Sequence, residues 1–156
     1  MGVAPQQPLF EDGLQQARAP HIPGIVKLAH EALKADPIKG QLIDWEKIQR
    51  TAQECVLDSI NYAGVSVMDG EVVAAVCALI IDQPVFERKM ASVAQFYTKV
   101  PGEGEKVIRE FLRWARGLRK IKSIVFTLEN GADPRIRLLL QRMGLRSEMT
   151  TMVEWR

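Results

Sequence analysis

This sequence of 156 residues has little of the chemistry that identifies metal or thiol enzymes, because it contains only two cysteines and two histidines. Cys55 falls within a helical apolar pattern and Cys77 within an apolar run typical of a strand, so we expect both to be buried core thiols in a reducing compartment. His21 and His30 both lie near one predicted helix, at a spacing that serves neither zinc nor an activated cysteine. We expect no metal site.

Long apolar runs are also missing. No segment approaches the roughly eighteen uninterrupted apolar residues that a membrane-spanning helix needs. The opening residues, MGVAPQQPLFEDG, do not place a basic segment before an apolar one, as a secretory signal does. We therefore expect a cytoplasmic protein with no membrane partner, and we interpret residues 1–13 as a flexible tail.

The net charge of +2 is small, but the charge is unevenly distributed. Between residues 99 and 122 there are eight Lys or Arg against three Glu. Such a stretch fits either a solvated helix face or a surface that meets an anion. No nucleic-acid-binding motif or interleaved aromatic surface accompanies it, which argues against nucleic acid as a partner.

Hydrophobic periodicity and turn residues predict one α+β domain over 14–156, in the order β-α-α-β-β-β-α-β-α-β. Asp44 is a candidate N-cap, and Asp69-Gly70 a candidate hairpin turn. Asp133-Pro134 is expected to start the last helix and Gly144 to end it. The expected strands cover 14–19, 62–67, 72–81, 90–100, 121–128 and 149–155. The helical apolar patterns cover 22–33, 45–56 and 107–118, and the last helix is expected over 134–143.

The segment between the strand at 90–100 and the next helix is the candidate site. A strand that ends in a glycine-rich turn before a helix directs several backbone N–H groups at one spot, which favours phosphate. Gly102 and Gly104 permit close approach, and Lys99 and Lys106 supply positive charge. The glycines alternatively serve packing alone, and the neighbouring acids Glu103 and Glu105 simply complement the helix dipole.

Several segments together resemble the Gcn5-related N-acetyltransferases. Arg18 to Leu28 is similar to the first strand and helix of that family. The hairpin, the loop at Val100-Pro101 and the segment Leu138 to Leu145 follow in the family's order. The resemblance covers the chain from about Leu14 and implies the acyl-CoA N-acyltransferase fold, a mostly antiparallel sheet flanked by about four helices.

The resemblance also implies a co-substrate, acetyl-CoA, and the residues that hold it. Acetyl-CoA would lie between the strands at 92–100 and 124–128, with its pyrophosphate on the amides of residues 102–106. Asn130 occupies a position where the family often places a polar contact to the cofactor. The implied contacts are Phe96, Tyr97, Thr98, Lys99, Val100, Gly102, Glu103, Gly104, Glu105, Lys106 and Asn130.

The implied reaction is acetyl transfer to an amine, on a small molecule or a protein, whose identity the sequence does not reveal. Candidates for the general base are Glu129 at a strand end, Gln95 holding a water, and Asp82 near the hairpin. Tyr97 and Trp45 either line an acceptor cleft or pack in the core.

Two positions depart from the family's pattern. The loop from Val100 to Glu105 is shorter and more acidic than the usual Arg/Gln-x-x-Gly-x-Gly/Ala signature, and Leu140 stands where many members have a tyrosine general acid. A second hypothesis is therefore a catalytically silent interaction protein. Segments 84–87 and 111–116 are similar to acetyltransferase-like bacteriophage proteins, which extends that hypothesis to a virion component. An edge strand at 149–155 would allow a homodimer.

Overall fold

The computed structural model describes residues 11–34, 43–82, 88–128 and 133–147. They fall into two compact units, one ending at Phe126 and one beginning at Thr127. The first unit contains a sheet with helices on both faces, and the second contains helix α5 (Pro134–Arg142). The expectation of a single domain over 14–156 stays a prediction.

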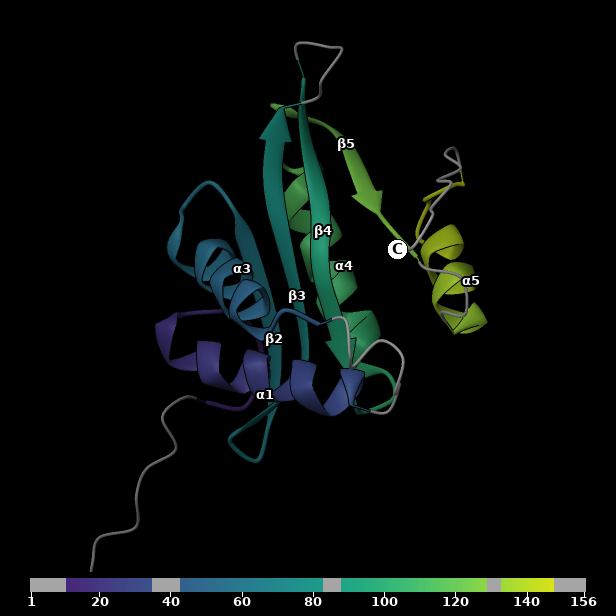
Figure 1. Ribbon diagram of the computed structural model, residues 1–156. Helices are drawn as coiled ribbons and strands as arrows, with labels where there is room; N and C mark the ends of the chain where they lie inside the picture. Colours follow the sequence, from purple (N-terminus) through teal and green to yellow (C-terminus); the bar gives the residue numbers. More distant parts are fainter. Residues whose placement is uncertain (1–10, 35–42, 83–87, 129–132, 148–156) are drawn as a thin grey trace, which may run out of the picture. The chain divides into compact units, whose positions relative to one another are not determined.

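The sheet confirms the α+β class and its mostly antiparallel character (Figure 1). Its five strands lie in the order of the sequence, and the first four pair antiparallel. The strands are β1 (Gly13–Gln16), β2 (Tyr62–Met68), β3 (Glu71–Asp82), β4 (Lys89–Thr98) and β5 (Ile121–Phe126). The last strand runs parallel to its neighbour, because helix α4 (Glu103–Arg116) carries the chain from the end of β4 back to the level at which β4 began.

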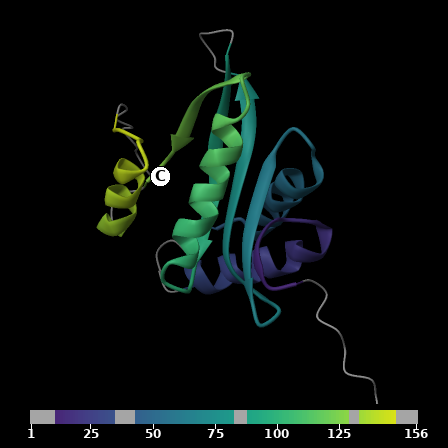
Figure 2. The same ribbon diagram turned by 180° about the vertical axis from the view of Figure 1, so that it is seen from behind.

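Helices α1 (Ile22–Leu33) and α3 (Trp45–Leu57) cover one face of the sheet, and α4 (Glu103–Arg116) covers the other (Figures 1 and 2). A short 3-10 helix, η1 (Ala19–His21), precedes α1. Among the described helices, none is both long and apolar enough to cross a membrane.

The core follows from the pattern of apolar residues. Helix α4 buries one face completely, while Arg109 and Arg113 lie outside. The strands beneath the helices are rich in Ala and Val, which allows the helices to approach closely. Cys55 and Cys77 are both buried, as expected. The buried residues of α4 are Gly104, Val107, Ile108, Phe111, Leu112 and Ala115.

The predicted turn and caps are confirmed. Asp69 and Gly70 have φ angles of 53° and 74°, the positive values that a two-residue hairpin turn requires. The carboxylate of Asp12 accepts hydrogen bonds from both of their amides, at 3.0 and 2.9 Å. Asp12 and Gly13 therefore take part in the folded unit, although they were expected in the tail.

The caps of two helices are side-chain carboxylates, as predicted. Asp44 caps α3 by accepting from the amide of Lys47 at 3.0 Å, and Asp133 caps α5 by accepting from Arg135 at the same distance. Gly144 follows α5 with a φ of 97°.

Three strands end two or three residues earlier than expected, and the other described strand boundaries differ by at most one residue. The first strand ends at Gln16 rather than residue 19, because η1 begins at Ala19. The strand at 90–100 is β4, which ends at Thr98, and the strand at 121–128 is β5, which ends at Phe126. The strand expected at 149–155 lies outside the described residues.

Gly104 and Gly117 provide a matched test of packing at the two ends of α4. A Cβ on Gly104 would lie 2.9 Å from Cβ of Thr98 and 3.0 Å from Cζ of Phe96, whereas the nearest atoms at Gly117 are at 3.4 Å. We expect Gly104→Ala to lower the free energy of unfolding by about 1–3 kcal/mol. Gly117→Ala is expected to be neutral or to stabilise by up to about 1 kcal/mol. Equal effects in urea unfolding would contradict this packing.

Candidate functional site

Strands β4 and β5 pair along only part of their length. Their parallel register begins at Lys89 and Ile121 and ends where Val93 lies beside Phe126. Beyond that pair β4 continues for five residues on β3 alone, and the ribbon of β5 turns away from it (Figure 1). The register with β3 skips Ala94, a β-bulge that coincides with the separation of the two strands.

This separation leaves one backbone edge of β4 open among the described residues. The amide of Lys99 donates to the carbonyl of Val73 on β3 at 2.9 Å. Residues of an antiparallel strand alternate in direction, so Tyr97 also bonds toward β3, while Phe96 and Thr98 direct N–H and C=O away from it. The open edge therefore presents two donors and two acceptors.

The first turn of α4 stands where the open edge ends. Gly102 precedes the helix with a φ of 86° and open space around its Cα. The amide of Glu103 donates to Val100 and that of Lys106 to Gly102. The amides of Gly104 and Glu105 have no hydrogen-bond partner within the described part of the chain, and the helix dipole favours an anion beside them.

The acidic side chains of this turn are already engaged. Glu103 accepts a hydrogen bond from buried Ser66 on β2 and pairs with Lys106 at 2.7 Å. Both contacts lower the pKa of the Glu103 carboxyl, and the contact with Lys106 has the larger effect. Glu105 pairs with Arg109 at 2.5 Å. Glu103 is thus drawn toward β2, on the side of β4 opposite the open edge.

Gly104 is needed for packing, since its missing Cβ makes room for Thr98 and Phe96 beneath the helix. The ring of Phe96 also meets that of Phe126 edge to face, with ring centroids 5.7 Å apart. Two half-buried aromatic rings therefore stand where β4 and β5 separate.

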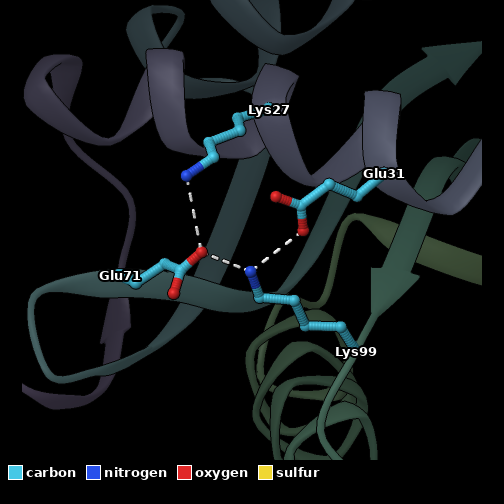
Figure 3. A network of polar contacts seen from close by, with 4 residues as sticks. All are labelled: Lys27, Glu31, Glu71 and Lys99. Carbon is cyan, nitrogen blue, oxygen red and sulfur yellow. Dashed lines mark hydrogen bonds and ion pairs between the residues drawn. The ribbon is translucent and has the colours of Figure 1, made fainter.

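The side chain of Lys99 belongs to a different cluster, on the side of α1. Its ammonium pairs with Glu31 of α1 at 2.9 Å and with Glu71 of β3, and Lys27 of α1 lies 3.6 Å from Glu71 (Figure 3). Two positive and two negative groups thus join α1, β3 and the end of β4. The charge of Lys99, expected at the phosphate rim, is neutralised by these carboxylates.

Gln95 is the most buried polar residue of β4, with 8% of its surface exposed. Its side-chain nitrogen donates to the carbonyl of Ile48 on α3 at 3.1 Å. Its side-chain oxygen is buried and has no hydrogen-bond partner among the described residues. Tyr97 shares this face of β4, and burial raises its pKa to about 12, so that it remains a neutral phenol.

Helices α1 and α3 form a groove that the sequence pattern did not reveal. His30 stacks on Trp45 with ring centroids 3.7 Å apart and planes 5° from parallel. The stack brings together residues from two helices, which no local spacing indicates. Trp45, which was expected either in the core or in a cleft, contacts His30, one of the residues that line this groove. The groove is lined by Ile22, Pro23, Val26, Lys27, His30 and Gln49.

The remaining sequence-predicted residues are Glu129, Asn130, Asp82 and Leu140. Glu129 and Asn130 lie outside the described residues. Asp82 is exposed and pairs with Lys89 at 3.0 Å. Leu140 is buried in α5, within the second unit. Within the described residues no group of three His, Cys, Asp or Glu is placed to hold a metal ion.

No family model matches the sequence, and no curated protein sequence matches it. Solved structures, by contrast, match its fold. An acetyltransferase from Clostridium difficile 630, described as a possible one, has a TM-score of 0.70 at 13% identity, over 92% of this chain and 95% of that one.

Two further structures share the fold at similar coverage. An aminoglycoside acetyltransferase from an uncultured soil metagenomic sample, in complex with sisomicin, has a TM-score of 0.66 at 11% identity, over 92% of this chain and 94% of that one. A ribosomal-protein-alanine N-acetyltransferase from Brucella melitensis has a TM-score of 0.64 at 14% identity, over 92% and 99%. At these identities the likeness shows the fold.

The ion pairs around Lys99 should make the stability of the fold depend on pH. These contacts raise the pKa of Lys99 and lower that of Glu71. The cluster therefore stabilises the fold fully between about pH 5 and pH 10. This stabilisation is lost at low pH, as the pH falls through the lowered pKa of Glu71, and at high pH, as the pH rises through the raised pKa of Lys99. We expect Lys99→Met to lower the melting temperature within this window.

Salt and a control variant separate this effect from lost packing. About 0.5 M salt should shrink the difference between Lys99→Met and the wild-type protein. Lys120→Met, which removes an exposed lysine with no ion pair among the described residues, is expected to leave the melting temperature unchanged. A difference that persists at about pH 3 and in high salt would show that the lysine stem, and not its charge, stabilises the fold.

Proposed function

We propose that this chain, which has the fold of the Gcn5-related N-acetyltransferases, is an acetyl-CoA-dependent N-acetyltransferase. The observation that carries the proposal is the separation of β4 from β5 after Val93, which leaves the backbone groups of Phe96 and Thr98 without a strand partner among the described residues. An enzyme of this class needs such an edge, because its co-substrate carries amide groups along an extended arm.

The open edge suits a ligand that binds as an added strand. Pantetheine has two amides, and a strand edge offers donors and acceptors at matching spacing. Phe96 and Thr98 supply the backbone groups, and the rings of Phe96 and Phe126 supply apolar contact. The residues of β4 implied by the sequence resemblance thus divide into two sets, with Phe96 and Thr98 directed at the arm and Tyr97 and Lys99 bonded to β3.

The first turn of α4 suits a pyrophosphate. The amides of Gly104 and Glu105 are available, and the helix dipole favours negative charge there. The acids of the loop, which seemed to oppose this use, are held aside by Ser66, Lys106 and Arg109. Lys106 remains 59% exposed and close enough to the turn to meet a phosphate.

Acetyl transfer forms a C–N bond, breaks the C–S bond of the thioester, and moves one proton from the amine to the departing thiolate. The protein's share is to align the two reactants and to donate hydrogen bonds to the carbonyl oxygen as it gains charge. Leu140 cannot supply a proton, so solvent is the expected carrier. Glu129 and Asn130 remain proposed as base and cofactor contact.

The acceptor is proposed to be an amine. The two neighbours with stated acceptors are an aminoglycoside acetyltransferase and a ribosomal-protein-alanine N-acetyltransferase, whose acceptors differ greatly in size and charge. The fold by itself therefore does not select the acceptor.

Thr98 allows a direct test of the open edge. Thr98→Pro removes the N–H that faces the edge but no bond to β3, whereas Thr98→Val keeps that N–H and the packing against Gly104. We expect Thr98→Pro to weaken the binding of acetyl-CoA roughly two- to twelvefold relative to Thr98→Val, the loss of one hydrogen bond. Isothermal titration measures both, and thermal unfolding confirms that both variants are folded.

Two ligands separate the parts of the site. Acetyl-pantetheine lacks the pyrophosphate, so its binding should depend on Thr98 but little on salt, whereas binding of CoA should weaken as salt rises. Absence of saturable binding of acetyl-CoA to the wild-type chain near millimolar ligand would contradict the proposed function. Equal affinities of the two Thr98 variants would contradict the use of this edge.

A further inference from the structure

Gln95 lies where the two strands begin to separate, one residue after the bulge at Ala94. Its side chain points to the face of the sheet that carries α3, the face opposite α4. Phe96 and Thr98, which pack beneath α4, point the other way. The buried side chain of Gln95 therefore lies on the side of β4 opposite the proposed pyrophosphate site.

The orientation of the Gln95 amide is fixed by its partner. Its nitrogen lies 3.1 Å from the carbonyl oxygen of Ile48, which can only accept, so the other amide atom must be the oxygen. That oxygen is buried and lacks a donor among the described residues. A buried acceptor left without a donor costs about 1–3 kcal/mol, which a ligand bearing an N–H would recover.

The charged side chains of α3, the helix that Gln95 contacts, are exposed. On β4 and β3, the partly buried phenol of Tyr97 and the buried thiol of Cys77 are neutral. Burial raises the pKa of Tyr97, and the hydrogen bond with Cys55, followed by burial, raises the pKa of Cys77. On α1 and β3, the carboxylates of Glu31 and Glu71 are bound to Lys99. Burying a charge without a partner is far more costly than burying a neutral amine.

We propose that the side-chain oxygen of Gln95 accepts a hydrogen bond from the incoming amine, and that the preferred acceptors are amines with a large uncharged fraction at neutral pH, such as the α-amine of a peptide. This inference rests on the proposed acetyl transfer and names its acceptor class. The hydrogen bond to Gln95 orients the amine lone pair toward the thioester carbon. The proton lost from nitrogen ends on the departing thiolate.

The expected selectivity follows from simple titration. At about pH 7.5 roughly a quarter to two-fifths of a peptide α-amine is uncharged, against roughly one part in a thousand of a lysine side-chain amine. A site that binds only the uncharged form, with no base among the described residues to generate it, would therefore favour the α-amine on the order of 10²-fold. The greater nucleophilicity of the lysine amine reduces this to about tenfold or more.

The test compares two peptides with the full-length protein and acetyl-CoA. One is an alanine tripeptide amide, with a free α-amine, and the other is Nα-acetyl-lysine amide, with only its side-chain amine. We expect kcat/KM for the tripeptide to be at least about tenfold higher at pH 7.5 and to level off above about pH 8. For the lysine compound, kcat/KM should rise about tenfold per pH unit up to pH 9.

Variants at Gln95 test the hydrogen bond itself. Gln95→Leu and ionised Gln95→Glu both lose the donor to Ile48, but only the glutamate keeps an acceptor oxygen. We expect Gln95→Leu to lower kcat/KM for the tripeptide roughly two- to twelvefold, the loss of one hydrogen bond. Gln95→Glu should recover most of it and should turn over the lysine compound at lower pH, because a carboxylate can take the proton. Acetyl-CoA should bind both variants alike.

The outcomes are distinct. Preference for the lysine compound, a tripeptide that is not acetylated by protein that binds acetyl-CoA, or equal losses in Gln95→Leu and Gln95→Glu would each overturn the inference. Equal losses would show that Gln95 only braces α3 through Ile48. If the wild-type chain fails to bind acetyl-CoA, the proposed function itself is wrong, whatever the amine.

Discussion

The site depends on one structural constraint, the end of β4–β5 pairing at Val93 and Phe126. A strand in the interior of a sheet ordinarily satisfies its backbone groups on both sides, because unpaired buried groups are costly. Within the part of the chain that the structure describes, β4 continues past its partner with β3 on one side only. A ligand with amides of its own would restore the missing partners, so the break in the sheet is the recognition element in the proposed function.

The bulge at Ala94 changes what each side of β4 presents. After it, Gln95 and Tyr97 face α1 and α3, while Phe96 and Thr98 face α4. The proposed acetyl donor thus uses backbone groups and the start of α4, and the proposed acceptor meets the amide of Gln95 from the other face. The ion pairs of Lys99 hold α1 to the end of β4, so both sides are tied to the same strand.

Local features were predictable from the sequence because their causes are local. The turn at Asp69-Gly70 needs positive φ angles, the caps at Asp44 and Asp133 need short acceptors, and α4 has a strong apolar period. The strand, glycine turn and helix of the candidate site were found for the same reason. The direction of Glu103 was not, since its partner Ser66 lies 37 residues away in the chain.

Features that depend on register and tertiary contact could not be read from the sequence. Nothing in the apolar run of β5 indicates that pairing stops at Phe126. The role of Gly104 in packing, the pairing of Lys99 with two carboxylates and the contact of Gln95 with Ile48 each join distant elements. Gln95 could be named as a candidate, but its free oxygen is visible only in the fold.

The most direct measurement of the central claim is amide hydrogen exchange, residue by residue, with and without CoA. The alternation of β4 predicts that CoA protects the amides of Phe96 and Thr98, together with Gly104 and Glu105. The amides of Tyr97 and Lys99, already bonded toward β3, should change little. Protection of every residue from 96 to 99, or of none, would contradict an open edge that binds the co-substrate as an added strand.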